Sequence, residues 1–152
     1  IMRTSWVYAS RGSNFVKTML RLAGEREELR VVSDQHGSPT WARLIAEATA
    51  HVIRQSIQER QQGQFQSDIY HLTNSGATTW HGFASRIIEL AREQGSQPLI
   101  TRQIHPIATA DYPLPAKRPA NSLLSTRKLE QKFGLSMPTW ENSLRLCLQE
   151  LV

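Results

Sequence analysis

The chain has 152 residues, of which 39% are hydrophobic and 20% charged, with one cysteine and a net charge of +5. A single cysteine excludes an intrachain disulfide, and no apolar run approaches the roughly 18 residues that a membrane span needs. The basic charge favours a polyanionic partner, but the cations are dispersed over helix-like segments and we interpret them as a solvated face. We therefore expect a one-domain cytoplasmic protein without a membrane or nucleic-acid partner.

Strand and helix patterns alternate along the first part of the chain. The expected elements are a strand over 2–8, a helix over 14–26, a strand over 29–32 and a helix over 41–61. Asn14 is a suitable N-cap for the first helix, and Thr40 for the second. Residues 34–40 are dense in turn-forming types and are expected to connect the second strand to the second helix.

The second part of the chain continues the alternation and then becomes less regular. The expected elements are a strand over 68–73, a helix from 78 or 79 to 94, a strand over 99–104, an extended loop over 106–119, and short helices over 125–133 and 139–152. The loop contains four prolines, which exclude regular structure, and loops of this length are usually functional. Trp80 begins a helix and is interpreted as a packing residue. The whole order predicts an α/β fold with a small, partly parallel sheet flanked by helices.

Five segments together resemble the dTDP-4-dehydrorhamnose reductases, a family of extended short-chain dehydrogenases/reductases. They are RTSWVY at 3–8, NFVKTML at 14–20, DQHGSPT at 34–40, YHL at 70–72 and PAKRPANS at 115–122. The segments follow the family's order and approximate spacing, and what they match is the C-terminal half of its members. The resemblance implies that residues 1–152 are the substrate-binding portion of a Rossmann-like fold and that an N-terminal cofactor-binding portion is absent from this chain.

The chemistry of such a reductase needs groups that this sequence lacks. A dinucleotide site needs a glycine cluster between a strand and a helix, and the eight glycines here are scattered. The family's tyrosine with a lysine four residues later is also missing, because the residues four positions after the tyrosines Tyr8, Tyr70 and Tyr112 are Gly12, Asn74 and Ala116. We expect no catalytic residue here, no activity from the chain alone, and NADPH or NADH bound elsewhere in the intact protein. The resemblance allows Mg²⁺, although no ligand spacing requires a metal.

Four residues are the candidate substrate contacts. The resemblance places Trp6 against the sugar, where an indole offers an apolar face and an N–H donor; the alternative is a core strand residue. Lys117 and Arg118 lie in the proline-rich loop and could pair with the diphosphate, Arg118 in bidentate fashion, or form an exposed basic pair. Asn121 adds a polar contact or caps the next segment.

The sequence thus predicts the substrate-binding part of a reductase that converts dTDP-4-dehydro-L-rhamnose to dTDP-L-rhamnose with NAD(P)H, for O antigen or cell-wall polysaccharide. Its expected partners are the dTDP-sugar, the missing half and a second copy in a homodimer. Two alternatives stay open. One is a non-catalytic binding or regulatory module with a reductase-like fold, and the other is a different nucleotide-sugar reductase or epimerase.

Overall fold

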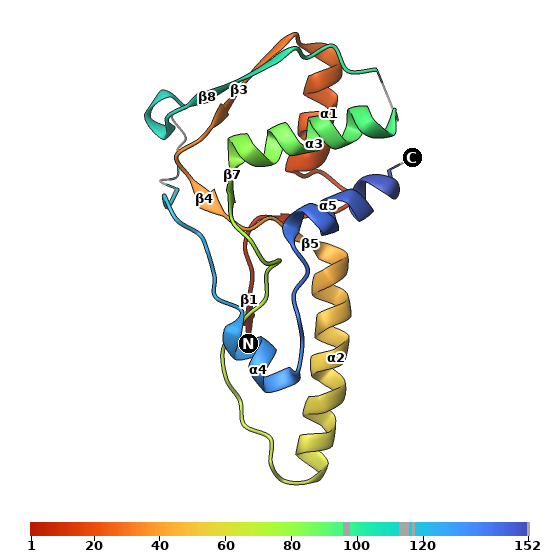
Figure 1. Ribbon diagram of the computed structural model, residues 1–152. Helices are drawn as coiled ribbons and strands as arrows, with labels where there is room; N and C mark the ends of the chain where they lie inside the picture. The colour runs from red at the N-terminus through yellow and green to blue at the C-terminus, as the bar shows by residue number, and fades with distance from the viewer. Residues whose placement is uncertain (96–97, 113–115, 117, 152) are drawn as a thin grey trace.

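The computed structural model describes residues 1–95, 98–112, 116 and 118–151 as helices packed around short paired strands (Figure 1). Three strand pairs are parallel and one is antiparallel. The parallel pairs are β1 (Met2–Arg3) with β6 (Tyr70–His71), β2 (Val7–Tyr8) with β5 (Thr40–Trp41), and β3 (Glu28–Val32) with β8 (Gln103–Ile107); the antiparallel pair is β4 (His36–Gly37) with β7 (Thr78–Thr79). This arrangement confirms the predicted α/β class with a small, partly parallel sheet.

The N-terminal segment is two strands, so the prediction of one strand over 2–8 is wrong. β1 pairs with β6 and β2 pairs with β5, and the chain changes partner at Trp6, whose φ of 48° lies in the left-handed region. A hydrogen bond from Thr40 N to Trp6 O, 3.0 Å long, fixes this change of direction. The break therefore serves to move the chain from one partner strand to another.

Two helices begin where local capping rules place them. In α1 (Phe15–Glu25), the side-chain oxygen of Asn14 accepts a hydrogen bond from Lys17 N at 3.3 Å. In α3 (Trp80–Gln94), Thr79 Oγ1 accepts one from Gly82 N at 3.0 Å. Each cap satisfies an amide of the first helical turn that has no partner inside the helix.

The prediction that Thr40 caps the next helix is wrong. Helix α2 (Ala42–Gln61) follows Trp41 and has no side-chain cap hydrogen bond at its N-cap. Thr40 is fully buried, and its hydroxyl donates to Ser38 O at 3.1 Å. The amide of Trp41 donates instead to Asn74 Oδ1 at 3.2 Å, so a residue distant in the sequence replaces the local cap.

The proline-rich segment begins with regular structure, contrary to the prediction for 106–119. Pro106 lies within β8, opposite Val31 of β3, and a 3₁₀ turn, Thr109–Asp111, follows. β8 pairs with β3 alone among the described strands, and a strand with one partner tolerates a proline whose missing N–H faces away from that partner.

Buried side chains form two cores. The larger lies among α1, α3 and α5 (Trp140–Gln149) and contains Tyr8, Phe83 and Leu144. The smaller lies where α2 meets β6 and α4 (Arg127–Phe133), and contains Leu72 and Leu129. Figure 1 shows α1 and α3 at one end of the molecule and α2 with α4 at the other, with β4 and β5 between them. Of the described helices, none is both long and apolar enough to cross a bilayer.

Candidate functional site

Trp6 is half-buried and is held by both faces of its indole. Its ring stacks on that of Trp80, with centroids 3.7 Å apart and an interplanar angle of 12°. A Cβ placed on Gly37 would stand 2.4 Å from Trp6 Cε2 and 2.7 and 2.8 Å from Cζ2 and Cδ2, two of the three atoms bonded to Cε2. Those distances put the backbone of Gly37 over the ring, on the face away from Trp80. The edge of the indole is the part left for a ligand.

Asn121 lies beside β4, the strand whose Gly37 covers the indole of Trp6. The amide of His36 donates to Ala120 O, and the amide of Ser122 donates to His36 O, both at 2.8 Å, so the segment around Asn121 runs parallel to β4. Asn121 Oδ1 accepts a hydrogen bond from Leu123 N at 2.9 Å, which makes this side chain a cap of its own segment. Asn121 is exposed.

Of the basic pair Lys117 and Arg118, the structure describes Arg118 alone. Arg118 is exposed and precedes Asn121 by three positions in the chain, so it lies near the end of β4 that Asn121 adjoins. Lys117 is outside the described residues. The structure therefore brings Trp6 and Asn121 to one strand and leaves Arg118 at its margin.

A chain of hydrogen bonds connects Trp80 to the segment after β8. Trp80 Nε1 donates to Gln35 Oε1 at 3.2 Å, and Gln35 Nε2 donates to Thr109 Oγ1 at 3.0 Å. The Thr109 hydroxyl in turn donates to Asp34 Oδ1 at 2.6 Å, and its amide reaches the same carboxylate. The Thr109 side-chain and backbone donors hold the pKa of Asp34 below its ordinary value.

The replacement Thr109→Val is expected to raise the pKa of Asp34 toward its ordinary value, because the hydroxyl donor is lost while the amide remains. An Asp with a lowered folded-state pKa stabilises the native contact at neutral pH, and that contribution is lost as the pH falls below about 4. A ¹³C NMR titration of the carboxyl carbons measures the change. Asp68, whose pKa is lowered mainly by its hydrogen bond from Lys128, should titrate as before, and an unchanged Asp34 curve would contradict the prediction.

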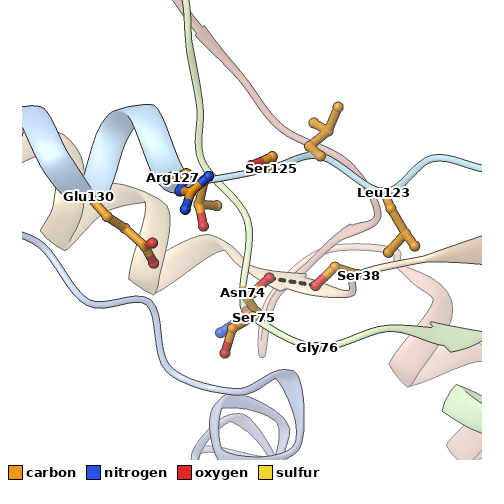
Figure 2. Close-up of a pocket in the computed structure, with 10 residues that line it drawn as sticks. Ser38, Asn74, Ser75, Gly76, Leu123, Ser125, Arg127 and Glu130 are labelled. Carbon is orange, nitrogen blue, oxygen red and sulfur yellow. Dashed lines mark hydrogen bonds between the residues drawn. The ribbon is translucent and has the colours of Figure 1, made fainter.

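An open pocket of about 520 Å³ lies next to β4 (Figure 2). Its floor is formed by Ser38, which follows β4, and by the turn after β6, and its side by the segment that leads into α4. The lining residues are Ser38, Asn74, Ser75, Gly76, Leu123, Leu124, Ser125, Thr126, Arg127 and Glu130. Hydroxyl groups, a guanidinium and a carboxylate on one open surface suit a ligand that carries hydroxyl and phosphate groups.

Asn74 joins the pocket lining to the start of α2 and to the segment that contains Pro138 and Ser143. Its Oδ1 accepts from Trp41 N, and its Nδ2 donates to Ser143 Oγ at 2.6 Å and Pro138 O at 3.0 Å. Its backbone oxygen accepts from Ser38 Oγ at 2.6 Å, the interaction drawn in Figure 2. Sequence reasoning missed this role because Asn74 stands in an Asn-Ser-Gly run that indicates a turn.

The described residues of the pocket lining are mostly small and polar, with one guanidinium and one carboxylate. Among the residues that the structure describes, the lining includes no Tyr, Lys, His or Cys. Tyr8 is buried in the larger core, where burial first and Cys147 second raise the pKa of its phenol. Burial also raises the pKa of the Cys147 thiol to about 12. Both groups are protonated at neutral pH and lie in the larger core.

Comparison with known proteins finds one family along the whole chain. The model of the RmlD substrate binding domain matches residues 1–152. The dTDP-4-dehydrorhamnose reductase of Burkholderia thailandensis is 50% identical over 151 residues, which are 99% of this chain and 51% of that protein. The protein of the same name from Escherichia coli K12 is 48% identical over 99% of this chain and 49% of its own length. The chain spans about half the length of these curated relatives.

Solved structures agree with the sequence relatives. A dTDP-4-dehydrorhamnose reductase from Bacillus anthracis in complex with NADP is 34% identical, with a TM-score of 0.74, over 98% of this chain and 47% of that one. A UDP-glucuronic acid 4-epimerase from Bacillus cereus, with a TM-score of 0.61 and 10% identity, shares the fold alone. The Rossmann-like class predicted from the sequence is confirmed. The chain therefore belongs to the RmlD substrate-binding-domain family.

Proposed function

We propose that this chain is the substrate-binding portion of a reductase that converts dTDP-4-dehydro-L-rhamnose to dTDP-L-rhamnose. The observation that carries the proposal is the meeting of Trp6 and Asn121 at β4, beside a hydroxyl-lined pocket. We propose that this surface binds the sugar nucleotide and that groups elsewhere in the intact protein carry out the reaction. The names of the relatives support the choice of sugar.

The four candidate residues receive separate roles in this proposal. The indole edge of Trp6 contacts the deoxysugar, and Asn121 adds a hydrogen bond from its exposed amide. Lys117 and Arg118 pair with the diphosphate, since a guanidinium binds two phosphate oxygens at once. Arg127, on the pocket side of α4, supplies a further cation to the nucleotide end.

The described residues do not fit a dinucleotide cofactor. The turn between β2 and α1 contains Gly12 as its single glycine, and the Lys17 amide at the start of α1 is already bonded to Asn14. We therefore propose that NADPH or NADH, together with the proton-donating tyrosine, is held by a half that precedes Ile1. The B. anthracis structure contains NADP, which supports NADPH as the first choice.

The remaining proposals concern the intact protein. We propose a cytoplasmic enzyme of dTDP-rhamnose synthesis for O antigen or cell-wall polysaccharide; a homodimer and Mg²⁺ stay expectations from the family. The relatives at 50% and 48% identity are named as reductases, which favours this function over a non-catalytic module. The epimerase at 10% identity gives little support to an epimerase.

An NADPH oxidation assay tests the proposal. With dTDP-4-dehydro-L-rhamnose, the 152-residue chain is expected to show no oxidation, and the protein extended upstream of Ile1 is expected to oxidise NADPH in step with the formation of dTDP-L-rhamnose. A UDP-linked 4-keto sugar serves as the control substrate and should react poorly. Oxidation by the short chain alone would contradict the proposed division of roles, and no reaction by the extended protein would contradict the assigned reaction.

A further inference from the structure

The backbone at Trp6 adopts a conformation that needs support from its surroundings. With φ at 48°, Trp6 is the one described residue other than glycine in the left-handed region. A bulky side chain rarely adopts this conformation, and it persists where neighbouring groups over-determine it. Residues that pack against the Trp6 side chain therefore help to stabilise its left-handed backbone conformation.

Trp80 and Gly37 are those neighbours. Trp80 covers one face of the Trp6 indole at 3.7 Å, and the backbone of Gly37 covers the other at a distance that leaves no room for a Cβ. A sugar ring cannot stack on either face of the indole while Trp80 and Gly37 cover both. A ligand that approaches Trp6 meets C–H and N–H groups along the edge of the ring.

Trp80 is itself held from two sides. Phe15 packs against it at a ring-centroid distance of 4.6 Å, and Gln35 accepts the hydrogen bond of its Nε1 at 3.2 Å. Gln35 is 7% exposed and donates to Thr109. Because both ends of the Gln35 amide are bonded, it fixes the rotation of Trp80 as well as its position.

We infer that Trp80 and Gly37 are positioning residues for substrate recognition, and that Gln35 sets Trp80 in turn. They hold Trp6 so that the sugar contacts the edge of its indole. The inference rests on the proposed function, in which Trp6 contacts the sugar. Part of the binding selectivity then resides in three residues that do not touch the substrate.

Steady-state kinetics on the intact reductase provide the first test. Gly37→Ala and Trp80→Leu are each expected to raise KM for dTDP-4-dehydro-L-rhamnose about tenfold, while kcat changes less than about threefold. Trp80→Phe keeps an aromatic ring but removes the Nε1 donor, and should give an intermediate KM. Gly24→Ala is the matched glycine control, because a Cβ there meets only Pro98 O at the ordinary distance of 3.6 Å, and its KM should not change.

Circular dichroism supplies a readout that does not depend on the reaction. Two indoles stacked as closely as Trp6 and Trp80 should produce an exciton couplet, which Trp80→Phe and Trp6→Phe abolish and Gly37→Ala weakens. If wild-type protein shows no couplet, or if folded Trp80→Phe and Trp80→Leu variants both keep the wild-type KM, the inference is overturned. An intact protein that shows the couplet but reduces no dTDP-sugar refutes the proposed function, and the substrate inference falls with it. Loss of the couplet together with a raised KM supports both.

Discussion

Replacement of Trp6 by alanine in the intact protein should raise KM for the dTDP-sugar by about tenfold to a hundredfold, a loss of roughly 1.4–2.8 kcal/mol of binding. The substitution removes the indole edge that we propose contacts the sugar. It also leaves an empty space between Trp80 and Gly37, so both residues lose the ring against which they pack. Initial-rate kinetics with varied sugar nucleotide and saturating NADPH measure the effect.

A second tryptophan separates recognition from general packing. Trp41 is 6% exposed and belongs to the larger core, so Trp41→Phe should lower the melting temperature and leave KM unchanged. If Trp6→Ala kept both KM and kcat, Trp6 would be a strand residue with a packing role alone. A raised KM for Trp6→Ala with an unchanged one for Trp41→Phe is the expected pair.

The largest effect on stability is expected at Asn74. Asn74→Ala should lower the free energy of unfolding by about 2–4 kcal/mol, because the buried amide of Trp41 and the hydroxyl oxygen of Ser143 lose their bonds to Asn74. Pro138 O loses one of its two donors and keeps the amide of Ser75. Asn74→Asp keeps an acceptor for Trp41 but loses the donor, so its loss should be comparable or larger if the acid is ionised. Urea unfolding followed by fluorescence measures both.

Asn142 provides the matched control for Asn74. Its side chain is exposed on α5, and its backbone amide keeps the bond to Thr139 Oγ1 whatever the side chain. Asn142→Ala should change the free energy of unfolding by no more than about 0.5 kcal/mol. Equal losses from Asn74→Ala and Asn142→Ala would show that the buried network contributes little.

The sequence predicted the helices best where their starts depend on neighbouring residues. Asn14 and Thr79 bond to amides three residues later, so the cap can be recognised from a short stretch of sequence. Thr40 looks equally suitable, but it is buried among strands and bonds to Ser38. Its failure as a cap reflects tertiary contacts that outweigh a local preference.

The sequence proposed candidate contact residues and gave no indication of the geometry around Trp6. The motif around Trp6 pointed to a sugar contact through the family resemblance, but the cover over both indole faces depends on Trp80 and Gly37. These two residues reach Trp6 only after β4 pairs with β7. A sequence pattern gives no sign of such a pairing, since the strands are two residues long and lie about forty positions apart in the chain.

The bonds of Asn74 also determine when this fold can be completed during synthesis. Its Nδ2 partners Pro138 and Ser143 lie 64 and 69 residues later in the chain. Contacts of such long sequence separation form late, because the intervening chain must close a large loop first. On the ribosome, the bonds that join Asn74, the partner of Trp41 at the start of α2, to Pro138 and Ser143 therefore form after α5 has emerged. Nascent chains released before residue 138 should stay protease-sensitive at this joint and depend on chaperones.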